Sequence, residues 1–215
     1  MPSAGLKICG LTHADDVDAC LEHRVDALGL NFWPGSKRAV TVPQAAALCR
    51  HARRGPGAAA LVGVFVDPEP AALLEAARAL GLDAVQPHGE APVEPYAALG
   101  VPYVWVIRGT PPLASLRMPS PAPAWILLDA HVPGFGGQGV RTDWDWAAEV
   151  VRALAPGPVW LAGGIAPHNA ARARQRVAPA GLDVASGAER AGDPRRKDAA
   201  AIAALAAICQ NPPAP

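Results

Sequence analysis

Two short segments of the chain each end an apolar run with a side chain that can transfer a proton. The segment Lys7-Ile8-Cys9-Gly10 carries a thiol, and the segment Leu127-Leu128-Asp129 ends on a carboxyl group. We interpret both as the ends of buried β-strands. A carboxyl group directly after a buried strand is partly desolvated, which raises its pKa towards that of a general acid. The pair therefore indicates a general base and a general acid that face each other.

Lys7 supports this interpretation of Cys9. The two residues share one face of a strand, because strand side chains alternate with a period of two. An ammonium group near a thiol lowers the pKa of the thiol and raises the thiolate fraction. A buried lysine needs a charged partner, which Asp129 or Asp183 can supply. The alternative is that Cys9 is only a buried apolar filler, as free cysteines usually are.

Three glycine-rich segments in the second half of the chain expose backbone N–H groups near the starts of expected helices. Such groups bind anions, and the helix dipole strengthens the effect. Glycines also make simple tight turns, but three such segments favour a phosphate site. Beside a proton-transfer pair, they indicate an isomerase that acts on a sugar phosphate. The predicted phosphate-binding residues are Gly137, Gly139, Gly163, Gly164, Ser186 and Gly187.

Lys7 and three further side chains are the predicted substrate-binding residues. The guanidinium group of Arg38 suits a carboxylate or a phosphate, although Lys37 and Arg38 also fit an exposed charged pair. His88 can orient a loop through hydrogen bonds or transfer a proton. Asp183 lies in the last expected strand. The other histidines have no metal-ligand spacing, so no metal site is expected.

The composition is that of a globular protein with balanced charge. Hydrophobic residues make up 51% of the 215 residues and charged residues 18%, which excludes a disordered chain. Lysine plus arginine and aspartate plus glutamate number 19 each, which argues against a nucleic-acid-binding protein. Neither a membrane-spanning apolar run nor a signal-peptide hydrophobic region is expected. The four cysteines form no CxxC pair, and Cys20, Cys49 and Cys209 fit buried helix positions, which favours the reducing cytoplasm.

Short apolar runs alternate with amphipathic stretches about eight times along the chain. Thr12 is expected to cap the first helix, with Asp15 three residues later. The proline-rich segment 109–123 does not fit a full helix, so the fifth crossover is expected to be degenerate. The expected strands cover residues 6–9, 27–32, 60–65, 84–86, 102–107, 125–128, 159–161 and 182–185. The later expected helices cover residues 41–53, 69–80, 93–99, 144–154, 167–177 and 198–208.

Strands that alternate with helices predict an α/β protein with a parallel sheet. Eight such units fit a single (β/α)8 domain, a TIM barrel, over residues 1–215. A doubly wound open sheet is the alternative, but the GxGxxG fingerprint after the first strand is missing. In a barrel the residues that follow each strand line one mouth, which would bring the predicted site residues together.

These motifs, in this order, resemble those of the phosphoribosylanthranilate isomerases of tryptophan biosynthesis. The resemblance covers almost the whole chain. Four residues depart from the family's usual pattern, namely Asn31, Pro87, Arg108 and Ala185, and none of them is a proposed catalytic group. The matching segments are 7–12, 29–32 with 36–38, 62–66, 85–90, 127–129, 136–139, 145–146, 161–165 with Asn169, 183–189 and 197–198.

The resemblance implies an Amadori rearrangement of N-(5-phosphoribosyl)anthranilate to 1-(2-carboxyphenylamino)-1-deoxyribulose 5-phosphate. It implies neither a metal nor an organic cofactor. Asp129 would protonate the ribose ring oxygen, and Cys9, as a thiolate, would remove the C2 proton. Arg38 would hold the anthranilate carboxylate or the polarised intermediate.

Two other functions stay open at this point. One is a different phosphosugar-processing barrel isomerase, and the other is a catalytically inactive ligand-binding barrel. Isomerases of histidine biosynthesis use two aspartates as acid and base, so Cys9 disfavours the first alternative. The only expected partner is a small phosphosugar substrate, without nucleic acid or membrane, and the protein is expected to be a monomer or a homodimer.

Overall fold

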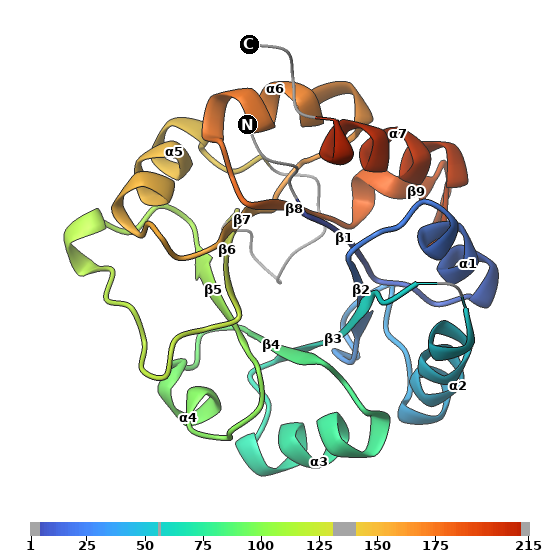
Figure 1. Ribbon diagram of the computed structural model, residues 1–215. Helices are drawn as coiled ribbons and strands as arrows, with labels where there is room; N and C mark the ends of the chain where they lie inside the picture. Colours follow the sequence, from blue (N-terminus) through green and yellow to red (C-terminus); the bar gives the residue numbers. More distant parts are fainter. Residues whose placement is uncertain (1–4, 56, 131–140, 212–215) are drawn as a thin grey trace.

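Eight parallel strands surround the axis of the molecule and helices cover their outer side, as the view along the axis in Figure 1 shows. This computed structural model describes residues 5–55, 57–130 and 141–211. The strands are β1 (Gly5–Cys9), β2 (Ala27–Asn31), β3 (Ala60–Val66), β4 (Ala84–His88), β5 (Val104–Arg108), β6 (Trp125–Asp129), β7 (Val159–Leu161) and β8 (Gly181–Val184). The helices are α1 (Ala14–Glu22), α2 (Val42–Arg54), α3 (Pro70–Leu80), α4 (Glu94–Ala97), α5 (Trp144–Ala153), α6 (Pro167–Val177) and α7 (Ala199–Gln210).

The strand order confirms a barrel and excludes the doubly wound sheet. The order is β4-β3-β2-β1-β8-β7-β6-β5, so the first strand pairs with both the second and the last. The ring is nearly closed between β4 and β5. There, a single parallel bridge joins Val85 to Tyr103.

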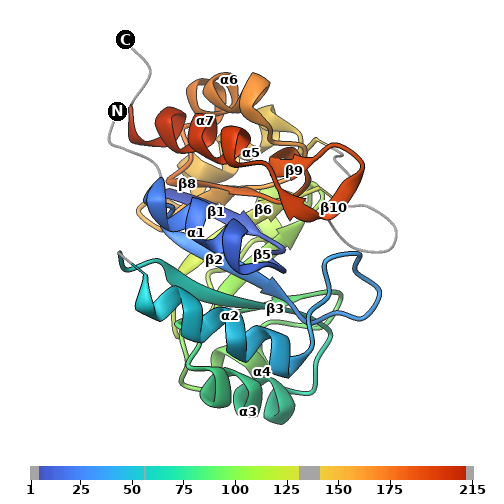
Figure 2. The same ribbon diagram turned by 90° about the vertical axis from the view of Figure 1, so that its right-hand side faces the viewer.

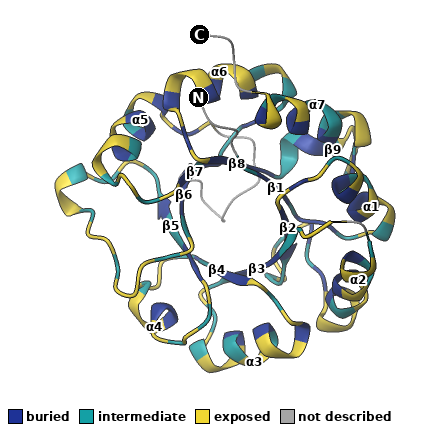
Figure 3. Ribbon diagram, viewed as in Figure 1, coloured by how far each residue is buried: buried dark blue, intermediate teal, exposed yellow. Residues whose placement is uncertain are grey.

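Amphipathic helices seal the outside of the barrel. Figure 3 shows that their inner faces are buried and their outer faces exposed. In α2, for example, Leu48, Cys49 and Ala52 are buried against the strands. Thr41 and Gln44 form a reciprocal capping box at the start of this helix, as its sequence pattern favours. None of the described helices is long and apolar enough to cross a membrane.

The expectation for the first helix is wrong in its detail. The helix begins at Ala14 and its N-cap residue is His13, which makes no side-chain cap hydrogen bond. Thr12 instead donates its hydroxyl hydrogen to the backbone carbonyl of Arg195. The side chain of Thr12 therefore bonds to a segment far away in the sequence, which a pattern of neighbouring residues cannot predict.

The fifth crossover is degenerate, as the sequence predicts. Between β5 and β6 the only helical turn is the short 3₁₀ helix η1 (Leu113–Ser115). The indole nitrogen of Trp146 on α5 donates a hydrogen bond to the carbonyl of Pro111, at 3.0 Å. This bond ties the proline-rich segment to its neighbour in place of a helix.

One element was not predicted from the sequence, a short antiparallel hairpin after β8. A 3₁₀ turn, η2 (Ser186–Ala188), leads into β9 (Glu189–Arg190) and β10 (Asp193–Lys197). The hairpin residues are mostly charged and show no apolar alternation, so no strand pattern was visible. Figure 2 shows the hairpin on the side of the barrel to which the strands point.

Two aspartates fasten the opposite end of the barrel. Asp26, before β2, accepts a hydrogen bond from the N–H of Leu6 and returns one from its own N–H to the Leu6 carbonyl. Asp83, before β4, makes the same reciprocal pair with Leu61, with its carboxylate 2.6 Å from the Leu61 nitrogen. Each aspartate thus satisfies the backbone groups at the start of a neighbouring strand.

Asp83→Ala should lower the free energy of unfolding by about 1–3 kcal/mol, because the N–H of Leu61 loses its acceptor. Asp83 also pairs with Arg53, but both of those side chains are largely exposed. The control Arg53→Ala should therefore cost only about 0–1 kcal/mol. Urea unfolding midpoints at equal slope measure both effects, and equal losses in the two variants would contradict this role of Asp83.

Candidate active site

The base of the barrel mouth holds a buried ion pair between β1 and β8. Lys7 is fully buried, and its Nζ lies 2.6 Å from Oδ2 of Asp183. The two residues pair in the strand register, so their side chains leave the sheet on the same side. Burial lowers the pKa of Lys7, but the charges of Asp183 and Cys9 outweigh burial and raise it. Of the two partners that the sequence suggested for Lys7, the structure selects Asp183.

Cys9 stands above this pair at the end of β1. Lys7, two residues earlier, shares its face of the strand, and the charge of Cys9 contributes to the raised pKa of Lys7. A Cβ atom at Gly29 on the neighbouring strand would lie 2.9 Å from the sulfur, so the glycine makes room for the thiol. Cys9 is partly exposed, whereas Cys20, Cys49 and Cys209 are buried. Burial raises the pKa of Cys20 to about 12 and that of Cys209 to about 11, so these thiols stay protonated.

Asp129 ends β6 in the same mouth and is buried. Its Oδ1 accepts a hydrogen bond from the N–H of Ala130 at 2.9 Å. Burial, and then the negative charge of Asp183, raise the pKa of Asp129 to about 6. This is the shift that the sequence predicts for a carboxyl group placed directly after a buried strand.

His88 faces Asp129 from the end of β4. Its Nε2 lies 3.6 Å from Oδ2 of Asp129, and the ring is buried. Burial, with the nearby cations Arg108 and Lys7, lowers the pKa of His88 to about 4. The imidazole is therefore neutral at physiological pH. The sequence left the role of His88 open, and the structure places it beside the predicted acid.

Arg38 is not the exposed charge that its neighbour Lys37 suggested as an alternative. It is only 8% exposed and its Nε donates a hydrogen bond to Oε1 of Glu189 on β9. A Cβ atom at Gly10 would lie 2.3 Å from Cδ of Arg38, and Gly10 has a φ of 78°. The arginine therefore packs across the backbone immediately after Cys9, where only glycine leaves room.

Arg108 spans the seam between β4 and β5. Its side chain is 9% exposed and forms an ion pair with Glu90, which follows β4. In the strand register Arg108 pairs with Asp129. The departure from the family pattern at this position thus places a guanidinium group at the mouth. Asn31, the other departure near the mouth, has a local role, because its Oδ1 accepts the N–H of Trp33 at 2.9 Å.

The loops after β7 and β8 meet at the predicted phosphate residues. Gly163 and Gly164 adopt φ values of 82° and 65°, which favour glycine. A Cβ atom at Gly187 would lie 1.9 Å from the carbonyl oxygen of Ile165, so the two loops touch. Ser186 directly precedes this contact. Gly137 and Gly139, the other two predicted phosphate residues, lie outside the described residues.

Two polar residues of the mouth, Lys197 and Glu189, were not predicted from the sequence as functional residues. Lys197 is buried, its Nζ donates to the carbonyl of Ala185 at 2.9 Å, and it lies 3.7 Å from Oε1 of Glu189. Both residues belong to the unpredicted hairpin. No local pattern in the sequence marks them, apart from their place in motifs that resemble the family.

Within the described ranges, no cluster of three or more His, Cys, Asp or Glu residues could hold a metal ion.

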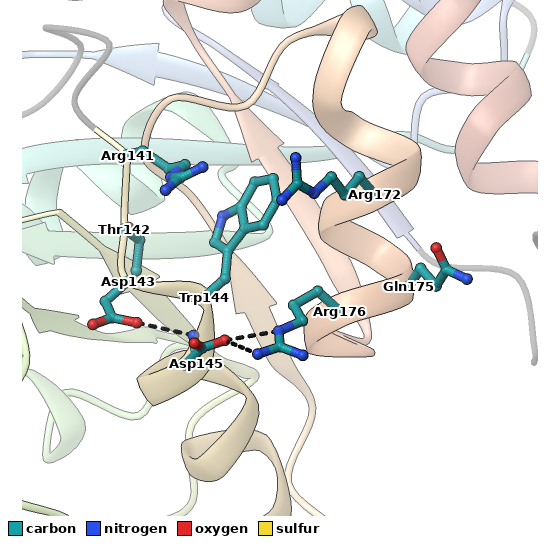
Figure 4. A pocket seen from close by; sticks show the side chains of 8 residues that line it. All are labelled: Arg141, Thr142, Asp143, Trp144, Asp145, Arg172, Gln175 and Arg176. Atoms are coloured by element: carbon teal, nitrogen blue, oxygen red, sulfur yellow. Dashed lines mark hydrogen bonds and ion pairs between the residues drawn. The ribbon is translucent and has the colours of Figure 1, made fainter.

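A separate cavity of about 750 Å³ opens on the outside of the barrel, along α5 and α6 (Figure 4). The guanidinium group of Arg141 lies 4.9 Å from the centre of the Trp144 ring, and Arg176 pairs with Asp145 at 2.6 Å. The lining contains none of the predicted site residues. The candidate active site is therefore the barrel mouth, where acid, thiol and glycine loops converge.

Known proteins are similar to this chain over nearly its whole length. The family model described as N-(5'phosphoribosyl)anthranilate (PRA) isomerase matches residues 6–207. An N-(5'-phosphoribosyl)anthranilate isomerase of Myxococcus xanthus is 43% identical over 207 residues, which is 94% of each chain.

Solved structures agree with this match. The crystal structure of phosphoribosyl anthranilate isomerase from Thermotoga maritima has a TM-score of 0.82 and 30% identity, over 96% of this chain and 98% of that one. A phosphoribosyl anthranilate isomerase in complex with reduced 1-(o-carboxyphenylamino)-1-deoxyribulose 5-phosphate has a TM-score of 0.78 and 28% identity, with the same coverage. The barrel, the family match and these relatives agree, and the chain belongs to the N-(5'-phosphoribosyl)anthranilate isomerase family.

Proposed function

We propose that this chain carries out the isomerisation of its family with Asp129 as the general acid and Cys9 as the general base. The observation that carries the proposal is the contrast between the two groups in one mouth. Asp129 is a buried carboxyl group whose pKa is raised to about 6, whereas Cys9 is a partly exposed thiol on the same strand face as the ammonium group of Lys7. Environments that separate two titratable groups in this way mark an acid and a base.

The reaction begins at the ribose ring of N-(5-phosphoribosyl)anthranilate. Asp129 gives its proton to the ring oxygen while the bond from that oxygen to C1 breaks. The lone pair of the anthranilate nitrogen forms a double bond to C1, which yields a protonated Schiff base and leaves Asp129 as a carboxylate. The ionised Asp129 then stabilises the positive charge on the Schiff base.

Cys9 acts on the Schiff base. Its thiolate removes the proton from C2, and the electrons of the C–H bond move through C1 to the nitrogen, which gives an enolamine. The enolamine then takes up a proton at C1 and loses its hydroxyl proton, so that C2 becomes a ketone. No oxidant or reductant is consumed, because the reaction only moves hydrogen and double bonds within the substrate.

The neighbouring side chains hold these two groups in place. His88, as a neutral imidazole 3.6 Å from Asp129, can hydrogen-bond the acid without repelling the Schiff base cation. Lys7, fixed by Asp183, places a positive charge on the same strand face as Cys9. Arg38 is proposed to bind the anthranilate carboxylate or the polarised intermediate, since its guanidinium is held at the mouth beside Cys9 by Glu189.

The phosphate is proposed to bind where the loops after β7 and β8 meet. Gly163 and Gly164 lie just before α6, and Gly187 packs directly against the β7 loop. Backbone N–H groups at a helix start favour an anion without a lysine or arginine. Gly137 and Gly139 are proposed as further members of this cradle.

Of the two alternative functions, neither fits the mouth as well. A phosphosugar isomerase with two aspartates would need a carboxylate where Cys9 stands. An inactive binding barrel would not need a buried acid beside a thiol. A fluorescence assay with the anthranilate-derived substrate separates the proposed reaction from both alternatives, and absence of turnover by the pure protein would contradict the proposed reaction.

We also propose that the protein acts in the cytoplasm on a small phosphosugar, without nucleic acid or a membrane as partner. The balanced charge and the unpaired, mostly buried cysteines support this location. For assembly, a monomer or a homodimer stays a prediction, which sedimentation velocity can decide.

Cys9→Ser and Asp129→Asn should each lower kcat by about 10²–10⁴-fold, the usual range for the loss of a general acid or base. Binding of a product analogue should survive in both variants, because neither change alters the shape of the mouth. Steady-state kinetics and calorimetry measure the two effects. Near-native kcat in either variant would show that its assigned role is wrong.

The pH dependence of kcat/KM should reflect Asp129. The acid works only when protonated, and its pKa is raised to about 6, so kcat/KM should fall as the pH increases through about 6. Asp129→Asn cannot lose that proton, and its residual activity should show no such step. A falling step that persists unchanged in Asp129→Asn would assign the titration to another group.

Gly164→Leu should raise KM sharply and leave kcat nearly unchanged, because the side chain would fill the proposed phosphate site away from the acid and base. Gly100→Leu is the matched control. Gly100 also has a positive φ, of 72°, but a Cβ atom placed there would have no other atom within 4 Å. Inorganic phosphate should inhibit the wild type competitively. Equal KM values in the two variants would place the phosphate elsewhere.

A further inference from the structure

Lys197 ends strand β10 of the hairpin and reaches the end of β8, the strand that neighbours β1 and its Cys9. Its ammonium group donates a hydrogen bond to the carbonyl of Ala185, at 2.9 Å. Ala185 follows directly after β8, whose last residue, Val184, pairs with Ile8, and Cys9 is the residue after Ile8 on β1. Adjacent strands lie about 4.8 Å apart. The hairpin thus brings the buried ammonium group of Lys197 to the strand end next to Cys9, although the hairpin is not part of the strand that bears Cys9.

The partners of Lys197 leave a positive charge at this position. Glu189 accepts a hydrogen bond from Nε of Arg38 and also lies 3.7 Å from Nζ of Lys197. One carboxylate therefore serves two cations, and the three groups together carry a charge of +1. All three side chains are at least 87% buried, so water screens this charge poorly.

The other charged groups around Lys197 and Cys9 form pairs of their own. On α1, the buried carboxylate of Asp16 accepts the backbone N–H of Lys197 at 2.9 Å and pairs with Arg196 at 3.1 Å. Lys7 on β1 and Asp183 on β8 form a neutral pair at 2.6 Å. Across the mouth, His88 on β4 is neutral, Arg108 on β5 forms an ion pair with Glu90, and burial favours the protonated, uncharged form of Asp129 on β6. The excess positive charge beside Cys9 is therefore that of the Arg38–Glu189–Lys197 cluster.

We propose that Lys197 is a positioning residue for the reaction, whose buried ammonium group favours the thiolate form of Cys9. The inference rests on the proposed role of Cys9 as the base. Lys197 acts through Cys9 and does not touch the reacting atoms. A thiolate at Cys9 would bring the local charge of the cluster and the sulfur to zero.

The ionisation of the two side chains is mutually supporting. Burial lowers the pKa of Lys197, and the negative charges of Glu189 and of an ionised Cys9 oppose that shift. A thiolate at Cys9 therefore keeps the ammonium charged, and the charged ammonium favours the thiolate. Lys7 contributes in the same direction from β1.

The test measures the ionisation of Cys9 without substrate. Iodoacetamide reacts with thiolates, and mass spectrometry of the Cys9 peptide reports its alkylation rate as a function of pH. In Lys197→Met the midpoint should rise by about one pH unit or more, with a fall of about tenfold or more in rate at neutral pH. Lys37→Met removes an exposed ammonium group and should leave the midpoint unchanged.

A second variant should shift the alkylation midpoint in the opposite direction, which a loss of the fold in the first variant could not imitate. Glu189→Gln keeps the size of the side chain but leaves Arg38 and Lys197 without a carboxylate, so the midpoint should fall. If Lys197 had only a structural role, the midpoint would not rise in Lys197→Met and also fall in Glu189→Gln. The inference is overturned if Glu189→Gln leaves the midpoint unchanged or raises it, or if a folded Lys197→Met keeps the wild-type midpoint.

These outcomes are independent of the proposed chemistry. If Cys9→Ser keeps near-native kcat, the role of Cys9 as base fails, whatever the alkylation profile shows. If Cys9→Ser is inactive but the alkylation midpoints do not move, only the role of Lys197 fails. In the supported case, the low-pH limb of kcat/KM in Lys197→Met shifts upward together with the alkylation midpoint.

Discussion

The buried ion pair between Lys7 and Asp183 is the constraint on which the rest of the mouth depends. A lysine that is fully buried requires a partner at close range, because an uncompensated buried charge is strongly destabilising. The pair forms only in the observed register of β1 and β8, since a slip of one residue would turn Lys7 out of the interior. The same register sets Cys9 above the ammonium group and closes the N-terminal strand against the C-terminal one.

Around this pair, the two halves of the mouth have opposite electrostatic character. Near β6, burial and the charge of Asp183 favour the protonated form of Asp129. Near β1, Lys7 and the hairpin's Lys197 place buried ammonium groups on the side of the mouth that bears Cys9. One mouth therefore has a side that favours a neutral carboxyl group and a side that carries positive charge, because the charged groups are placed unevenly.

Features set by local spacing were predictable from the sequence. The strand ends gave Cys9 and Asp129, and the period of two put Lys7 with Cys9. Features set by distant contacts were not. Thr12 binds Arg195 instead of capping its own helix, and Glu189 buries Arg38, although the sequence separates these partners by more than 150 residues. The charged hairpin has no apolar alternation that could reveal it.

The seam between β4 and β5 gives the ring a direction in which it can open. Along it, the described strands share one isolated bridge, from Val85 to Tyr103, and one ion pair across the rim, from Arg108 to Glu90. Backbone amides along the seam lack the ladder that protects the other strands, so they are expected to exchange with solvent before those of the paired strands. In mechanical terms the barrel is a curled sheet with two meeting edges, and His88 and Arg108 end the two strands that form those edges.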